Sequence, residues 1–468
     1  MAEKQGVASY RAGRYDPAIN ALEAALAGYR TVGDAESVAR VSGRLAYAHY
    51  RRGTSYDALG ELAVTAEGDP APAVEASPGT LTWWGGLLLQ LYAQGSYTKL
   101  VTLGRSLARA GRAADNTTMQ AIGTRVEGAG LISLGRLAEG TALMAAALPA
   151  EPAIADDAGA AEAAALLSAA YLAMGEMDHC AALSERMLAA AERAGDQVLT
   201  AMHTVYLAGV CYVRGDWDRG RDLVGLAQER IAASSSPMAV RLVGVLASAL
   251  VLDGAWQQAR AYLEGSLRAA RSLRIVRVER VALTHLARLD LLDGRPQDAV
   301  TRLHPVTADR PAPAAEDLTW DTPVELLSVL AEAHLELSDL DRARAYARSA
   351  VDHARRMGVW LELIRALEVH GMVLARDGRH DLARVAYQEG LDRARAMPFP
   401  YGQARLLHAY GLLDRQRQDH AAAHAKFVQA LAILERLGAD KDAGRLRRAI
   451  ADTAPSEDLR GQIPQRRR

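Results

Sequence analysis

The sequence predicts an all-α fold, a right-handed α-solenoid of about eleven helix hairpins. Three observations lead to this prediction. A turn residue, in most repeats glycine, recurs about every forty residues along the whole chain. Small residues stand at fixed distances before and after that turn. The composition is dominated by the helix formers Ala, Leu, Arg and Glu, and only 16 of the 468 residues are proline.

The turn residues define the repeats, which we number 1 to 11 in chain order. They are Gly13, Gly53, Gly95, Gly135, Gly175, Gly215, Gly254, Gly294, Ser338, Gly378 and Gln418. Their successive spacings are 40, 42, 40, 40, 40, 39, 40, 44, 40 and 40 residues. We expect each turn residue to end the first helix of a hairpin, helix A, because glycine adopts the left-handed backbone of such an end with little strain.

Two columns of small residues flank the turn. Seven positions before it stand Gly6, Ala46, Gly128, Ser168, Ala208, Ala247, Ala287, Ala331, Gly371 and Gly411, and five positions after it stand Ala18, Ala58, Gly140, Cys180, Gly220, Ala259, Ala299, Ala343, Ala383 and Ala423. Small side chains at matched heights let helices A and B approach closely. Two positions after the turn, bulky side chains can plug the base of the hairpin, as at Tyr15, Tyr97, Trp217 and Trp256.

This register of glycine, bulky residue and small residue is typical of tetratricopeptide repeats. Their period is about 34 residues, whereas HEAT and armadillo repeats run to about 40–47. We favour tetratricopeptide-like hairpins over HEAT repeats, with helices lengthened by about one and a half turns in total. Repeat 3 departs from the pattern, because Leu88 and Leu100 stand at both small positions and Trp83 and Trp84 precede them. It is either a locally wider helix pair or a distorted binding site.

Proline-rich segments suggest how the repeats are grouped. We expect about eight repeats in residues 1–303, a Pro-rich loop or hinge at 304–323, and about three repeats plus a capping helix in 324–451. The polar, basic tail 452–468 is expected to be disordered. Helix A of repeat 1 has room only for Ala2 to Ala12, which led us to the hypothesis that a partner domain once preceded Met1.

Composition and local patterns indicate the compartment of the protein and the kinds of partner that it lacks. The formal net charge of −1 argues against the basic surface of a nucleic-acid binder. Two cysteines, Cys180 and Cys211, cannot build a disulfide framework and read as packing residues in a reducing compartment. The longest near-apolar run, Leu242 to Leu252, is about half of a membrane span. We therefore expect a cytoplasmic protein without membrane or direct nucleic-acid contact.

Motifs that carry chemistry are missing from the sequence. It contains no Walker loop, no Cys-x-x-Cys pair and no Gly-x-Ser-x-Gly elbow. His420 and His424 have the spacing of two metal ligands on one helix face, but no third ligand is evident, so a surface pair is the better interpretation. We expect no catalytic residue, no cofactor and no metal.

The concave face offers candidate binding residues, since helix A lines the inner side of such a solenoid. Positions three, six and ten before the turn should point inward. In the early repeats they include Tyr47, Tyr50, Tyr92 and Tyr212, and in the later repeats Arg288, Glu332, Glu368 and His408. An aromatic early groove and a charged late groove would suit a peptide or a polar small ligand. The alternative is that some tyrosines only pack between neighbouring helices.

The C-terminal stretch adds a more specific resemblance. Residues 398–450 begin with PFPY, continue as a helix that ends in Tyr410-Gly411, and contain ALAILERLGA. This pattern resembles the end of the helical sensor region of bacterial signal-transduction ATPases, that is, MalT-like regulators of the LuxR family and activators of antibiotic clusters. The resemblance implies stacked helix pairs that receive an inducer or a partner protein. The ATPase and helix-turn-helix domains of that family are not found in this sequence.

Three functional hypotheses follow. The first is a non-catalytic binding or sensing scaffold that recognises a protein, a peptide or a small-molecule inducer on its concave face, in bacterial signalling or transcriptional regulation. The second is an accessory or unusual enzyme of a biosynthetic pathway that uses the groove as its site. The third is a structural subunit of an assembly. The repeat, the missing motifs and the resemblance favour the first.

Overall fold

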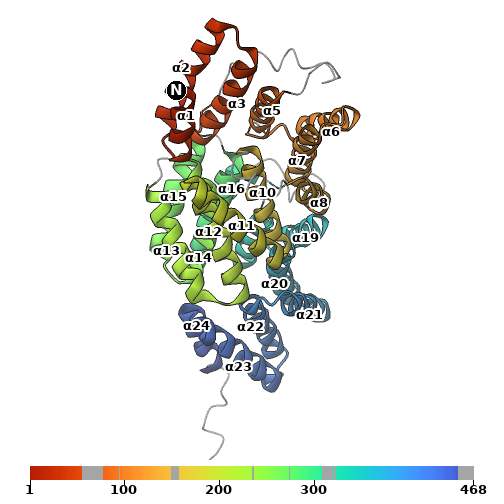
Figure 1. Cartoon of the computed structure of the whole chain (residues 1–468). Helices are drawn as coiled ribbons and strands as arrows, with labels where there is room; N and C mark the ends of the chain where they lie inside the picture. The colour runs from red at the N-terminus through yellow and green to blue at the C-terminus, as the bar shows by residue number, and fades with distance from the viewer. Residues whose placement is uncertain are drawn as a thin grey trace, which may run out of the picture.

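A computed structural model describes residues 1–54, 77–93, 95–148, 158–233, 237–273, 275–307, 320 and 323–451. These residues form 22 α-helices and one short 3-10 helix, η1, and none of them belongs to a strand. The predicted fold class is confirmed, because consecutive helices pair as hairpins that stack along the chain (Figure 1). No helix in this described part of the chain is long and apolar enough to cross a membrane.

The helices alternate between the two positions of the repeat. Helices A are α1 (Ala2–Arg11), α3 (Ala35–Arg52), α5 (Pro78–Ala93), α7 (Thr117–Ser133), α10 (Ala158–Met174), α12 (Gln197–Arg214), α14 (Val243–Leu252, preceded by η1, Pro237–Leu242), α16 (Val276–Leu292), α18 (Val324–Glu336), α20 (Trp360–Arg376) and α22 (Pro400–Gln416). Helices B are α2 (Tyr15–Val32), α6 (Tyr97–Ala113), α8 (Leu137–Ala147), α11 (Met177–Ala194), α13 (Trp217–Ala233), α15 (Trp256–Ser272), α17 (Pro296–Thr307), α19 (Leu340–Met357), α21 (His380–Ala396) and α23 (His420–Leu437). A last helix, α24 (Asp440–Ala451), follows repeat 11.

The turn residues predicted from the sequence lie where helix A ends. All eleven have a positive backbone φ, between 62° and 87°. At Gly215 the amide donates to the Tyr212 carbonyl at 3.3 Å, and the next amide, of Asp216, donates to the Cys211 carbonyl at 2.9 Å. Both bonds satisfy carbonyls that the end of a helix would otherwise leave without partners. The spacing of about forty residues is therefore the spacing of the helix ends.

The small-residue columns also have the packing role that we predicted. Ala208, Ala247 and Ala259 are completely buried. In repeat 4 the two backbones approach so closely that a Cβ on Gly140 would lie 2.6 Å from the Gly128 carbonyl oxygen. Helices A and B can pack this closely only where the residues at the contact have the smallest side chains.

Repeats that are five apart in sequence lie against one another. Met357 at the end of repeat 9 lies against the repeat 4 turn at Gly135, and Met397 lies against the repeat 5 turn at Gly175. Leu437 in repeat 11 covers Gly215 in repeat 6 in the same way. The chain thus curls back on itself, and α19 and α20 run beside α8 and α10 (Figure 1).

Two tryptophans link the middle of the chain to its C-terminal end. Trp217 plugs its own hairpin by donating its indole N–H to the Tyr212 carbonyl at 3.1 Å, and its ring centroid lies 5.6 Å from that of Tyr401 in repeat 11. The Lys441 ammonium of α24 lies over the Trp256 ring in repeat 7, at 3.9 Å from the ring centroid. The bulky position after the turn therefore serves both the hairpin and the contact across the superhelix.

Parts of the predicted domain division fall outside the described residues. These are the tail 452–468, most of the Pro-rich segment 304–323 and the second helix of repeat 2. Residues 304–307 belong to α17. Near the other end of the Pro-rich segment, Trp320 is buried, donates its amide to the Ser133 carbonyl at 3.2 Å and lies under the Arg277 guanidinium at 4.1 Å.

The close approach in repeat 4 predicts opposite effects for two glycine substitutions. Gly140→Ala should lower the free energy of unfolding by about 1–3 kcal/mol, because the new methyl group meets backbone atoms that cannot move aside. Gly225→Ala in α13 is the matched control, since a Cβ there meets no atom within 4 Å and should stabilise the helix by about 0.5–1 kcal/mol. Urea denaturation followed by circular dichroism measures both. Equal effects of the two substitutions would contradict the packing role of the small columns.

The contact across the superhelix predicts a large effect at Trp217. Trp217→Ala should lower the free energy of unfolding by about 3–5 kcal/mol, because the ring packs against both Tyr212 and Tyr401. Leu226→Ala on the same helix removes an exposed side chain and should change it by less than about 0.5 kcal/mol. Denaturant titration of both variants decides the point, and a small effect at Trp217 would show that the contact between repeats 6 and 11 contributes little.

Candidate functional site

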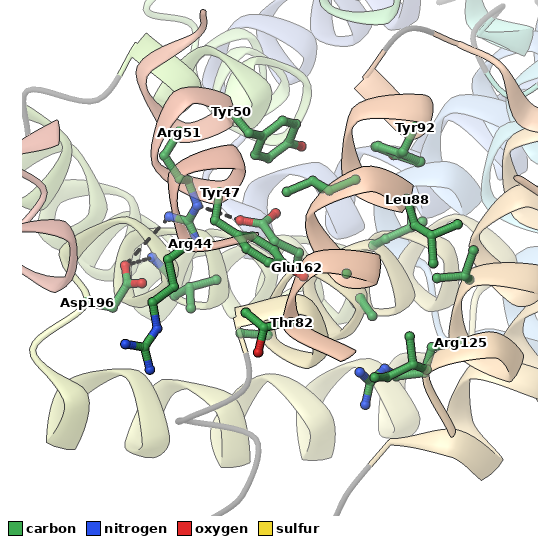
Figure 2. A pocket seen from close by; sticks show the side chains of 18 of the residues that line it. Arg44, Tyr47, Tyr50, Arg51, Thr82, Leu88, Tyr92, Arg125, Glu162 and Asp196 are labelled. Atoms are coloured by element: carbon green, nitrogen blue, oxygen red, sulfur yellow. Dashed lines mark hydrogen bonds and ion pairs between the residues drawn. The ribbon is translucent and has the colours of Figure 1, made fainter. Parts of the chain in front are cut away.

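The first seven repeats surround a cavity of about 600 Å³. Its walls come from α1, α2, α3, α5, α6, α7, α10, α11 and η1 and from the start of α12, so segments far apart in sequence share it (Figure 2). A volume of this size falls within the range of about 300–1,000 Å³ that is typical of sites for small organic ligands.

The irregular third repeat forms one side of this cavity. α5 packs tightly on α3, because a Cβ on Gly43 would lie 2.3 Å from the Thr82 carbonyl oxygen. Leu88 and Leu100, the large residues at the small positions of repeat 3, are buried and line the cavity. The departure from the repeat pattern therefore coincides with the place where space is left between helices.

Three of the predicted groove tyrosines meet in this cavity. Tyr47 and Tyr50 on α3 and Tyr92 on α5 all line it, and Tyr50 points toward Tyr92 (Figure 2). Apolar side chains complete this part of the wall: Leu81, Leu89, Ile122, Val126 and Leu166. Tyr10 on α1 also lines the cavity, and its buried hydroxyl finds no hydrogen-bond partner among the described residues. The lining thus combines a large apolar and aromatic surface with a few polar groups.

A buried group of charges forms another wall. The Arg51 guanidinium lies between two carboxylates, at 2.5 Å from Glu162 and 3.7 Å from Asp196 (Figure 2). Arg241 from η1 reaches the same Glu162 at 3.2 Å and donates to the Tyr50 hydroxyl. Buried ions are tolerated when they are paired in this way. These pairs tie α3, α10 and η1 together, which belong to repeats 2, 5 and 7.

The environment keeps this group of charges ionised. Burial raises the pKa of Glu162, but the guanidinium groups of Arg51 and Arg241 outweigh it, and the net pKa is lowered. Burial raises the pKa of Tyr50, so its hydroxyl stays protonated at neutral pH. The site therefore presents fixed charges and neutral phenols.

Tyr212, the fourth predicted tyrosine, lies elsewhere. Its hydroxyl donates to Asp253 in the next repeat at 2.7 Å, and its ring packs 5.5 Å from Trp217. It does not line the cavity. These contacts give Tyr212 a packing role between repeats, and its suggested role in ligand binding stays a prediction.

The later repeats use their predicted charged positions in a network on the inner face. Arg288 on α16 pairs with Glu325 on α18 at 2.9 Å, and Arg365 on α20 pairs with Glu332 on α18. Glu368 forms ion pairs with Arg365 and with Arg405 on α22, both at 2.9 Å. The structure thus places Arg288, Glu332 and Glu368 together and pairs each of them with a neighbouring repeat.

Protonation states follow from this pairing. Although burial raises the pKa of Glu368, Arg365 and Arg405 lower it to about 2. Burial lowers the pKa of His408, which packs edge-on against Phe427 with ring centroids 5.9 Å apart. His408 therefore stays neutral at physiological pH and contacts helix B of its own repeat.

Glu362 stands apart within this network. Its carboxylate lies at the N-terminus of α18 and accepts from the Glu325 amide at 3.2 Å. Burial and the nearby Glu325 carboxylate raise the pKa of Glu362 to about 7. Two carboxylates close together in a poorly solvated place cannot both ionise easily, so Glu362 takes up a proton near neutral pH.

The sequence analysis missed the charged residues of the cavity. Glu162 is the single charged residue of α10, and Arg241 is the single charged residue of the segment from Pro237 to Leu252. An isolated charge in an otherwise uncharged helix needs a partner in the fold, so this pattern could have identified both residues. Arg51 carried no comparable signal, because it follows Tyr50 in an arginine-rich helix end.

The remaining reactive groups are held in structural positions. Cys180 is buried, its thiol lies 3.3 Å from the Ser168 carbonyl oxygen, and burial raises its pKa to about 12. Among the described residues, no three His, Cys, Asp or Glu side chains are grouped so that they could hold a metal ion. His420 lies on the surface, 3.3 Å from the Gln418 side chain. The arrangement in the cavity is suited to binding by contact and charge.

Several solved structures are similar to this chain at low sequence identity. Neither a family model nor a curated protein matches the sequence. Among solved structures, the chain is similar to a Rap protein complexed with competence and sporulation factor (13% identity, 71% of this chain and 97% of that one, TM-score 0.45). It is also similar to the Cut9–Hcn1 hetero-tetramer of APC/C (11% identity, 94% and 88%, TM-score 0.47) and to BtubC from P. vanneervenii (18% identity, 58% and 94%, TM-score 0.31). This chain has the architecture of a tetratricopeptide-like helical repeat protein.

The raised pKa of Glu362 predicts a pH dependence of stability. Its pKa in the folded chain, about 7, exceeds its ordinary value of 4.5, so the folded state binds more protons between these values and loses stability as pH rises from 5 to 8. Glu362→Gln should therefore raise the free energy of unfolding at pH 8 by about 2 kcal/mol and change it little at pH 5. Thermal unfolding across this range measures the effect.

A matched substitution serves as the control for this pH dependence. Glu185→Gln removes an exposed carboxylate on α11 and should leave the wild-type pH profile unchanged. If Glu362→Gln stabilises equally at pH 5 and pH 8, titration of Glu362 is not the cause.

Proposed function

We propose that this chain is a non-catalytic sensing scaffold that receives a ligand in the cavity of its first seven repeats. The observation that carries the proposal is the construction of that cavity. Its wall joins α3, α10 and η1 through Arg51, Glu162 and Arg241, so a ligand there would touch repeats that are far apart in sequence. A molecule in such a place can stabilise one curvature of the solenoid over another.

The charged positions of the later repeats are less suited to a ligand than the early cavity is. Arg288, Glu332 and Glu368 already pair with neighbouring repeats, so a ligand would have to break those ion pairs. The apolar part of the early cavity requires no such loss, because its tyrosines and leucines face unfilled space. The early groove is therefore the better candidate.

The cellular role is part of the proposal. The resemblance of residues 398–450 to the sensor region of MalT-like regulators supports a place in bacterial signalling or transcriptional control, in the cytoplasm, with an inducer in the cavity and a protein or peptide partner on the solenoid surface. In this scheme ligand binding alters how repeats 2, 5 and 7 meet at Arg241, and the partner detects the changed curvature.

Binding of a neutral fluorescent probe tests whether the cavity accepts ligands. Nile red should bind the full chain saturably at one site, with a rise in fluorescence, because its size and polarity suit the apolar lining. Ala163 lines the cavity from α10, and Ala163→Phe should weaken binding at least about tenfold by filling the space.

The control variant places the same side chain outside the cavity. Ala182→Phe adds it to an exposed position on α11 and should leave the affinity unchanged. Thermal unfolding of both variants shows whether they remain folded. Nile red binding that survives Ala163→Phe, or no saturable binding by the wild-type chain, would contradict the proposed site.

A further inference from the structure

The cavity adjoins a second recess that is rich in positive charge. This recess of about 640 Å³ is lined by α1 and α3 and by the end of α11, and it shares Val7, Arg11, Arg44 and Ala194 with the main cavity. Among the described residues that line it, four side chains are cationic, namely Lys4, Arg11, Arg40 and Arg44, and one is acidic, Glu3. The recess is therefore a cationic mouth of the main cavity, made of Lys4, Arg11, Arg40 and Arg44, of which Arg11 and Arg44 line both spaces.

The single carboxylate of the mouth is already engaged. Glu3 accepts from the Tyr29 hydroxyl at 2.8 Å, from two nitrogens of Arg40 at 2.8 and 3.0 Å, and from Arg44. Glu3 is thus shared by Arg40 and Arg44, and Glu36 also acts on Arg40. Like charges so close raise one another's energy, and an additional anion would lower it.

Arg44 is a residue of the mouth that a ligand can reach. Its side chain is 38% exposed, it lines both spaces, and in Figure 2 its guanidinium is directed away from Glu162. Burial lowers the pKa of Arg44; the Glu3 carboxylate opposes this effect, and the positive charges of Arg40 and Arg11 add to it. A guanidinium in such surroundings is a strong partner for a carboxylate, which it can bind through two parallel hydrogen bonds.

The arginines deeper in the cavity have a different role. Arg51 and Arg241 pair with Glu162 and Asp196, so these two guanidinium groups are compensated, and Arg125 is a further cation that lines the wall from α7. The inner space is instead lined by Leu81, Leu88, Leu89, Tyr47 and Tyr92. Polarity therefore changes along the cavity, from a cationic mouth to an apolar and aromatic interior.

We infer that the ligand is an amphipathic acid, whose apolar body lies among the leucines and tyrosines and whose carboxylate binds at Arg44. This inference rests on the proposed function and adds the chemical class of the ligand. A free carboxylic acid and the apolar C-terminal end of a peptide share this chemistry. A cationic ligand would meet the excess of positive charge at the mouth and is disfavoured.

Three probes with one chain length and different head groups test the inference. Isothermal titration calorimetry of the full chain with decanoate, decanamide and decylamine, below their micellar concentrations, isolates the contribution of the head group. We expect decanoate to bind at least about tenfold more tightly than decanamide, and decylamine to bind most weakly. Equal binding of decanoate and decanamide, preference for decylamine, or no binding of any probe would overturn the inference.

Substitution at Arg44 locates the head group. Arg44→Gln should reduce the affinity for decanoate to that for decanamide, while the affinity for decanamide stays unchanged and shows that the cavity is still folded. Arg52→Gln, on the same helix but paired with Asp16 on the outer surface, should leave both affinities as in the wild type. A preference for decanoate that survives Arg44→Gln would overturn the assignment of the head group.

An acetylated apolar tetrapeptide distinguishes a peptide end from a small carboxylic acid as the source of the carboxylate. It is prepared with a free C-terminus and as the amide. Tighter binding of the free peptide than of decanoate assigns the site to a peptide end, and the reverse assigns it to a small acid. Failure of the acid class remains distinct from failure of the cavity, because Nile red is neutral and its binding depends only on the space that Ala163→Phe fills.

Discussion

Contact between repeats five apart decides what the inside of this solenoid looks like. A side chain from one repeat lies on the bare turn of another, as Met357 does at Gly135 and Met397 at Gly175. An open solenoid leaves helix A exposed along its concave face. Here the curling buries it, and every residue of α12 from Val198 to Val213 is buried. The turn glycines thus end helices and also provide the flat surfaces on which distant repeats dock.

Because the interior is closed, the polar groups inside it need partners. Charges removed from water must be paired, or the folded state is destabilised by several kcal/mol for each ion. The later repeats meet this condition by linking successive helices A, with Arg288 on Glu325 and Arg405 on Glu368. The early repeats meet it with one group around Arg51 and Glu162, beside the space that the irregular repeat 3 leaves open.

The early and the later repeats therefore differ in how their interior is filled, although buried charges are paired in both. In the later half, ion pairs and packed side chains fill the inner face, which favours a fixed curvature. In the early half, tyrosines and leucines face a cavity, and a cationic mouth formed by α1 and α3 leads to it. The proposed sensing function would use both, a stable part and a part whose contacts a ligand can change. Within the early half, Arg241 joins repeat 7 to repeat 2, since it donates to the Tyr50 hydroxyl.

Much of this protein was determined by its sequence alone. Turns, helix ends and small-residue columns follow from local sterics, so all eleven turn residues and the all-α solenoid could be predicted. The inward tyrosines Tyr47, Tyr50 and Tyr92 were found by the same periodicity. Only the tertiary structure decided which of the inward positions face a cavity, because that depends on the small rotation that each repeat adds. Such rotations accumulate over five repeats and are not written in any one of them. This is why Tyr212 packs between repeats, why Arg288 and Glu368 are paired, and why Arg44 could not be recognised from the sequence.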